Sequence, residues 1–136
     1  MNPCEELSMP TLVFDPALDQ AAFERQFFSC VLRRNGEHID ALRRMVEVFA
    51  TAGEHEKALP LDFRLVRLLP HNCIVRYNLA CSLAMTGQIE AAMDELHEAI
   101  QRGYSDVVHL QTDPDLDPLR GHPLYNELIR RFRGIR

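Results

Sequence analysis

The 136-residue sequence has no tryptophan and no long apolar run. A helix that spans a bilayer needs roughly 20 consecutive apolar residues, so the sequence predicts no membrane-spanning segment. Aromatic residues are few, at 7% of the chain, and a core built instead from Leu, Ala, Val and Met favours helices over sheets. The first ten residues, MNPCEELSMP, lack the basic start and apolar centre of a secretory signal. We therefore expect a cytoplasmic protein.

Other missing features narrow the choice of function. The net charge of −5 argues against a typical nucleic-acid-binding protein, which carries an excess of basic residues. The motifs G-x-G-x-x-G, G-x-x-x-x-G-K-[ST] and H-E-x-x-H do not occur. His55 is flanked by Glu54 and Glu56, but adjacent side chains on a helix point apart and do not converge on a metal. The sequence thus predicts a protein that is not an enzyme and uses no metal or cofactor.

The four cysteines follow no functional pattern. Cys4, Cys30, Cys73 and Cys81 match neither C-x-x-C nor a disulfide framework. The last three lie within helical patterns, where an unpaired cysteine packs as a small hydrophobic residue. We expect them to be structural.

A repeat with a period of 34 residues runs through the middle of the chain. Gly53 and Gly87 are 34 residues apart, and so are Ala58 and Ala92. Apolar residues upstream of each glycine also correspond at helical spacing, namely Met45 with Leu79, Val46 with Ala80, and Phe49 with Leu83. Because glycine can end a helix in the left-handed conformation at little cost, each unit is predicted to be two helices joined at a glycine.

A helix–turn–helix unit of this length and punctuation resembles the tetratricopeptide repeat. The resemblance is carried by Met45, Phe49, Gly53, Ala58 and Pro70 in the first unit, and by Leu79, Ala80, Leu83, Gly87, Ala92, Leu96 and Ala99 in the second. It implies an all-α fold, a short right-handed α-solenoid of antiparallel helix pairs. The expected parts are a flexible segment at 1–16 and one helical domain at 17–136, with a capping helix at 17–35, repeats at 38–71 and 72–104, and a degenerate repeat at 105–132.

Small residues at two inward positions fit this resemblance, and two other residues depart from it. Ala80 and Ala92 stand where leucine would bury more area, and small side chains let paired helices approach to roughly 8 Å. In the first unit, Asp62 replaces an aromatic residue of the family pattern. Pro60 interrupts the second helix of that unit, so we expect a kink or a late start near residues 56–60.

The sequence after the second repeat is similar to a tail that often follows the last repeat in bacterial proteins of this family. Its Asp-Pro-Asp-Leu and Pro-Leu-Arg elements occur in TDPDLDPLRGHPLYNELIRRF. Pro114 and Pro118 break the first helix of a third unit, whose turn glycine would be Gly121, 34 residues after Gly87. A last helix is expected to cover the apolar end of the short array, which improves solubility. Its covering face would contain Leu124, Leu128 and Phe132.

In the family, the first helices of successive units line a concave groove that holds a peptide or a partner helix. Carried over by position, the groove residues are Asp40, Arg43, Arg44, Glu47 and Thr51 from the first unit and Tyr77, Asn78, Cys81 and Met85 from the second. The amide of Asn78 can donate to and accept from a peptide backbone, and Arg43 and Arg44 can hold a carboxylate. One hypothesis is a clamp of these three residues. The alternative is that both arginines are solvated and that Asn78 caps a neighbouring loop.

The resemblance implies a non-catalytic protein–protein interaction module, acting as an adaptor, scaffold or assembly factor for a protein or peptide partner. Two alternatives stay open, a small chaperone for a secreted or assembling subunit and a structural subunit that self-assembles. The second would stack the acidic residues 1–24 on the basic C-terminal end of another copy. A further surface, suited to a basic partner, is the acidic face formed by Glu90, Asp94, Glu95 and Glu98.

Overall fold

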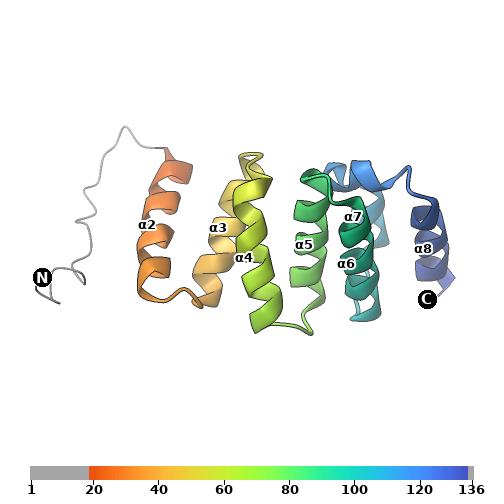
Figure 1. Cartoon of the computed structure of the whole chain (residues 1–136), viewed down its shortest axis with the longest axis horizontal. Helices are drawn as coiled ribbons and strands as arrows, with labels where there is room; N and C mark the ends of the chain where they lie inside the picture. Colours follow the sequence, from red (N-terminus) through yellow and green to blue (C-terminus); the bar gives the residue numbers. More distant parts are fainter. Residues whose placement is uncertain (1–18, 135–136) are drawn as a thin grey trace, which may run out of the picture.

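The chain forms a row of helices packed side by side. The computed structural model describes residues 19–134. Within them lie α2 (Gln20–Arg34), α3 (Ile39–Thr51), α4 (His55–Leu68), α5 (Cys73–Met85), α6 (Ile89–Gln101), α7 (Val107–Thr112), the 3₁₀ helix η1 (Pro114–Leu119) and α8 (Pro123–Gly134). From α2 to α6 they follow one another along the long axis of the molecule, and α8 lies at its far end (Figure 1). The predicted all-α class is confirmed, whereas the segment 1–16, expected to be flexible, lies outside the described residues.

From α2 to α6 each helix packs against the next, so the chain builds consecutive pairs, and η1 then packs on α5. α3 packs on α4, α4 on α5, and α5 on α6. Gly53 and Gly87 end the first helix of two pairs in the left-handed conformation, with φ of 75° and 81°. In both turns the N–H of the residue after the glycine donates to the carbonyl of the residue four before the glycine. Glu54 donates to Phe49 at 2.8 Å, and Gln88 donates to Leu83 at 2.9 Å. The 34-residue period is therefore present in the backbone as well as in the sequence.

The period does not extend to a third glycine turn. Gly121 has no positive φ, whereas Gly103, after the end of α6, has a φ of 105°. The expectation that Gly121 makes an equivalent turn is therefore wrong. The cause lies upstream, where α7 ends at Thr112 and two prolines shape the 3₁₀ helix that follows. Proline lacks the N–H that a continuing α-helix needs, so Gly121 does not follow a full-length first helix.

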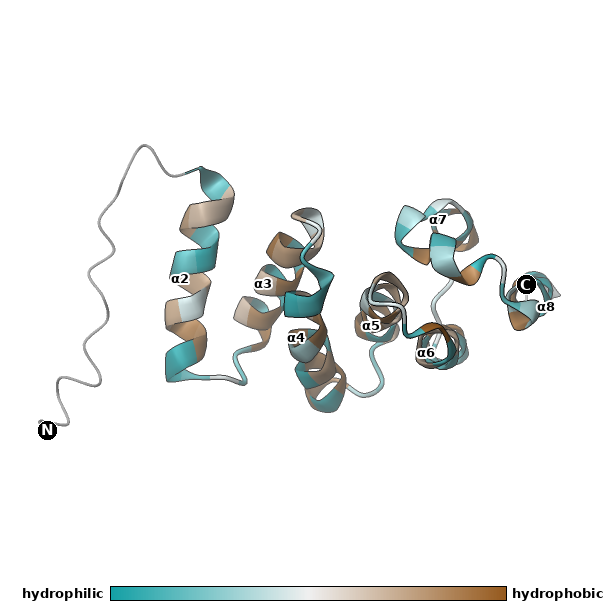
Figure 2. Cartoon of the chain, turned by 45° about the horizontal axis from the view of Figure 1, so that its top comes forward, coloured by the Kyte–Doolittle hydropathy of each residue, from teal (hydrophilic) through white to brown (hydrophobic). Residues whose placement is uncertain are grey.

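The largest hydrophobic core runs from α5 through α6 into the C-terminal segments. Ala80 and Ala92 have no exposed surface, which is the burial expected of small residues at a close helix contact. Leu79, Leu83 and Leu96 beside them are also fully buried. α5 is largely brown in Figure 2, the colour of hydrophobic residues, in keeping with its place between α4 and α6.

α4 is continuous through its proline. The helix begins at His55 and includes Pro60, so the predicted late start is wrong. Proline at this position removes one backbone hydrogen bond and crowds the carbonyl of Glu56. Both residues are exposed, and water can satisfy that carbonyl. The cost to the helix is therefore confined to its solvent side.

α8 buries a face that begins one residue later than predicted. Tyr125, Leu128, Ile129 and Phe132 are buried, whereas Leu124 is 55% exposed. The inclusion of Leu124 in the covering face was therefore wrong. A buried stripe on a helix recurs at spacings of three and four residues, and here that stripe starts at Tyr125.

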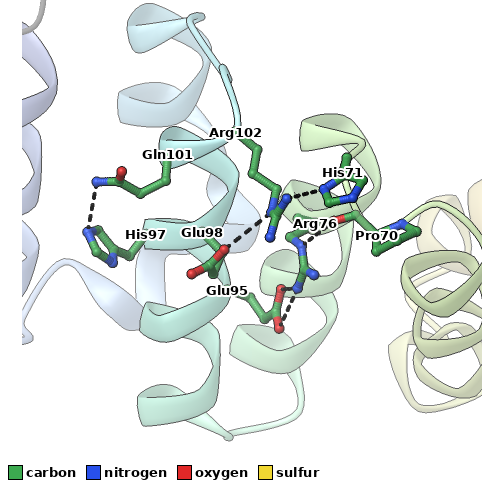
Figure 3. A network of polar contacts seen from close by, with 8 residues as sticks. All are labelled: Pro70, His71, Arg76, Glu95, His97, Glu98, Gln101 and Arg102. Carbon is green, nitrogen blue, oxygen red and sulfur yellow. Dashed lines mark hydrogen bonds and ion pairs between the residues drawn. The ribbon is translucent and has the colours of Figure 1, made fainter.

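Polar contacts join α6 to the loop between α4 and α5 (Figure 3). Arg76 donates to the carboxylate of Glu95 at 3.0 Å and to the carbonyl of Pro70 at 3.0 Å. Arg102, just beyond α6, contacts His71 in the same loop. Arg76 belongs to α5, so its two bonds join α5 to the loop before it and to α6.

The tight contact between α5 and α6 can be tested with one substitution. We expect Ala92→Leu to lower the free energy of unfolding by about 1–3 kcal/mol, because a fully buried small residue leaves no space for extra methylenes. Urea denaturation followed by circular dichroism would measure this. Ala91→Leu is the matched control, since Ala91 is exposed on the same helix, and equal stability of both variants would contradict a close contact.

Candidate functional site

A groove of about 590 Å³ lies along the side of the molecule formed by α3, α5 and the segments after α6. Six of the nine groove residues expected from the sequence line it, namely Arg43, Glu47, Thr51, Tyr77, Asn78 and Cys81. Further lining residues, which the sequence comparison had not assigned, are Val46, Ala50, His55, Leu65, Asn72, Ile74, Val75, Ser82, His109, Asp113 and Asp115. The first helices of the two complete pairs thus form the groove together.

The other three expected residues lie elsewhere. Asp40 is in the first turn of α3 and does not line the groove. Met85 lines a separate hollow beside the turn at residues 53–57. Arg44 faces α2, where it pairs with Glu24 at 2.7 Å, and it also pairs with Glu47 at 2.9 Å. The structure therefore brings Arg43 and Asn78 to one groove but places Arg44 outside it.

Arg43 and Asn78 are, with Thr51, exposed polar residues of the groove whose side chains have no partner among residues 19–134. Both side chains are exposed, and neither forms a hydrogen bond or ion pair with another described residue. Ile74 adds an apolar surface beside them and is 52% exposed. A guanidinium, a carboxamide and an aliphatic side chain are therefore available together to a ligand in the groove.

Asp113 fixes the C-terminal wall of the groove. Its carboxylate accepts a hydrogen bond from the Tyr77 hydroxyl at 2.7 Å and one from the Cys81 thiol at 3.7 Å. His109 lies 3.4 Å from the same oxygen. The Tyr77 ring is stacked on that of Tyr104, with centroids 4.3 Å apart. α5 and the segment after α7 are thus joined by a buried carboxylate and its donors.

The same carboxylate changes the acidity of its donors. Burial, and then the hydrogen bond to Asp113, raises the pKa of Tyr77. Burial, with the charges of Asp113 and Asp115, also raises the pKa of the Cys81 thiol. A thiol reacts as a nucleophile only when it is ionised. Cys81 is therefore held in its unreactive form.

Asp115 and His55 lie at this end of the groove, and each has a side-chain atom without a hydrogen-bond partner among the described residues. The carboxylate of Asp115 accepts no hydrogen bond from any described residue, although its backbone N–H donates to Asp113 at 3.0 Å. Burial, together with the charge of Asp113, raises the pKa of Asp115. His55 is 8% exposed, and its Nδ1 has no partner within residues 19–134. Neither group is needed to hold another side chain in place.

A buried carboxylate lies behind the groove, between α4 and α5. Asp62 has no exposed surface, and the hydroxyl of Ser82, which lines the groove, donates to its Oδ2 at 2.5 Å. Oδ1 of Asp62 has no partner in the described part of the chain. Burial raises the pKa of Asp62 to about 7, and the bond from Ser82 opposes this only partly. Asp62 occupies the position where the family pattern has an aromatic residue, and Phe63 beside it is 50% exposed.

Two of the four acids on the acidic face of α6 are paired with arginines. Glu95 pairs with Arg76, and Glu98 pairs with Arg102 at 3.3 Å. Glu90 contacts His122 at 2.8 Å, and Asp94 has no partner among the described residues. These contacts join α6 to its neighbours and leave Glu90 and Asp94 without an arginine or lysine partner.

The described residues hold no group of three or more His, Cys, Asp or Glu side chains arranged to bind a metal ion. No helix in residues 19–134 has the length and apolar content required to cross a membrane.

Comparison with known proteins gives one distant relative to report. The chain is 28% identical over 99 residues to a chloroplastic protein of Arabidopsis thaliana that contains tetratricopeptide repeats. The match covers 73% of this chain and 25% of the relative, so the chain spans about a quarter of the length of that protein. No protein-family model matches the chain, and no solved structure matches it. The protein is therefore a helical, repeat-like protein distantly related to this chloroplastic protein.

The buried carboxylate of Asp62 makes the stability of the fold depend on pH. Folding raises the pKa of Asp62 from about 4 to about 7, so between these values the folded state binds a proton that the unfolded state has lost. The free energy of unfolding should therefore fall as pH rises from about 4 to about 7, by up to about 1.4 kcal/mol per pH unit, and level off above that range.

Asp62→Asn removes this titration and keeps an acceptor for Ser82. We expect this variant to match the wild type near pH 4 and to be more stable at pH 8, as measured by thermal unfolding across that range. Asp94→Asn is the control, because Asp94 is exposed. A lower stability of Asp62→Asn than of the wild type at pH 8 would show that the buried group is not a destabilising carboxylate.

Removal of the Tyr77 hydroxyl should loosen the groove wall. Tyr77→Phe leaves the Asp113 carboxylate, which is 10% exposed, without its closest donor, at a cost of about 1–3 kcal/mol. We expect faster hydrogen exchange of the backbone amides in residues 115–120, read by mass spectrometry or NMR. The amides of α3 serve as the internal control. Unchanged exchange of residues 115–120 would mean that other contacts hold the wall.

Proposed function

We propose that this protein is a non-catalytic protein–protein interaction module of the tetratricopeptide type that binds an extended peptide or a partner helix in the groove. The observation that carries the proposal is that α3 and α5 line one groove together, and that two exposed polar side chains in it, Arg43 and Asn78, have no partner among the described residues. A folded protein usually satisfies or solvates such groups. Their placement beside exposed Ile74 supports a ligand role.

The chemistry of the groove supports binding over catalysis. The Cys81 thiol donates to Asp113 and has a raised pKa, so it is a poor nucleophile. Arg43 can form paired bonds with a carboxylate, and Asn78 can bond a peptide group as donor and acceptor. These are recognition groups, and an adaptor or assembly factor needs no others.

The proposal is tested by partner capture, in which the wild type and a variant changed only in the groove serve as baits. The groove variant is Arg43→Glu/Asn78→Ala. Arg44 is kept, because a glutamate there would face the nearly buried Glu24 and destabilise the fold. We expect a partner retained by the wild type to bind this variant at least tenfold more weakly, since loss of a buried charged contact commonly costs about 2 kcal/mol or more.

The matched control is Arg67→Glu/Gln101→Ala, which makes the same charge change on exposed residues of α4 and α6 outside the groove. It should bind like the wild type. A partner held equally by both variants would place the binding surface elsewhere, and recovery of the protein itself alone would support self-assembly. A captured partner that aggregates when expressed alone would favour the chaperone alternative.

A further inference from the structure

The two ends of the groove differ in charge. At the end formed by α3, the unpaired group is the guanidinium of Arg43. At the end formed by α7 and the segment after it, the lining groups are the carboxylates of Asp113 and Asp115 and the imidazole of His109, which lies 3.4 Å from Asp113. Glu47, the other acid in the groove, is already paired with Arg44. The charge of the groove therefore changes along its length, from a cation at one end to acids at the other.

The acidic end has one carboxylate with several donors and one with none. Asp113 is satisfied by Tyr77, Cys81 and the N–H of Asp115, but the carboxylate of Asp115 accepts no hydrogen bond from the described chain. Nδ1 of His55, a residue more than nine-tenths buried that lines the same groove, has no hydrogen-bond partner among the described residues. Asp115 is half-buried, so water reaches its carboxylate in the free protein, and a ligand that brings several N–H groups can replace this water with charge-assisted bonds.

We propose that the acidic end of the groove selects a lysine or arginine side chain of an extended peptide, which seats against Asp115 while Asn78 bonds the peptide backbone. The proposal rests on the proposed function, because it names the peptide that the groove binds. Guanidinium and ammonium groups form charge-assisted bonds with carboxylates. Arg43, at the other end, then suits an acidic group of the same peptide. Among the described residues no metal cluster competes for this role.

Two variants isolate the charge of Asp115. Asp115→Asn removes the charge and leaves the backbone N–H that bonds to Asp113. Asp117→Asn is the matched control, because Asp117 lies in the same 3₁₀ helix, is exposed, and pairs with Arg120 outside the groove. Both variants change the net charge by one unit. Thermal unfolding should confirm that both fold.

The probe is a library of random 12-residue peptides displayed on phage, selected on the wild type, both of these variants and Arg43→Glu/Asn78→Ala. Sequencing should show an excess of Lys or Arg at one peptide position for the wild type and for Asp117→Asn, and no such excess for Asp115→Asn. One enriched peptide, made with a fluorescent label, should bind Asp115→Asn about tenfold more weakly than the wild type. Replacement of its basic residue by methionine should weaken binding to the wild type but not to Asp115→Asn.

The outcomes separate this proposal from the proposed function. Peptides that depend on Arg43 and Asn78 but show no basic preference would overturn the role of Asp115 and leave groove binding in place. If Asp115→Asn and Asp117→Asn select the same peptides, the role of Asp115 is also overturned and groove binding stays in place. If no enriched peptide is weakened by Arg43→Glu/Asn78→Ala, the groove is not the binding surface, and both proposals fail.

Discussion

The shape of the groove depends on one buried carboxylate. Asp113 accepts bonds from Tyr77 and Cys81 of α5 and from the backbone of its own segment, and its carbonyl accepts from Arg120 at 2.7 Å. These bonds hold the C-terminal segment against α5. Without these bonds, the groove would be open at its C-terminal end, where α7 and η1 stand in place of a third full helix pair. The segment that covers the hydrophobic end of the array therefore also supplies one wall of the proposed binding site, and gives that wall its negative charge.

The architecture could be predicted from the sequence because it follows from short-range rules. The 34-residue spacing of Gly53 and Gly87, with small residues at Ala80 and Ala92, is enough to predict two helix pairs. The structure shows both glycines with positive φ and both alanines without exposed surface. Only residues without a β-carbon adopt that backbone conformation cheaply. The same rules failed at Gly121, because two prolines upstream remove the helix that such a turn would end.

The site was predictable only in part, because its polar pairings join residues distant in sequence. Position within a repeat led us to expect Arg43 and Asn78 in one groove, and both line the groove of the structure, while their role in binding stays a prediction. It could not show that Arg44, the next residue, pairs with Glu24 of α2. Nor could it show that Asp115, in a segment known only as a cap, lines the groove. Asp62 stood out in the sequence because it departs from the tetratricopeptide pattern that the chain resembles. Its bond from Ser82 could not be predicted, because Ser82 lies on another helix.

Binding along α3 and α5 can be tested by cross-linking. A photo-crosslinking amino acid is placed at exposed positions in living cells, one at a time. Ile74 lies in the groove, and Ala91 lies on α6 outside it. We expect a cross-linked partner from position 74 and none from position 91. A partner cross-linked from position 91 alone would place the binding surface on α6 and contradict binding along α3 and α5.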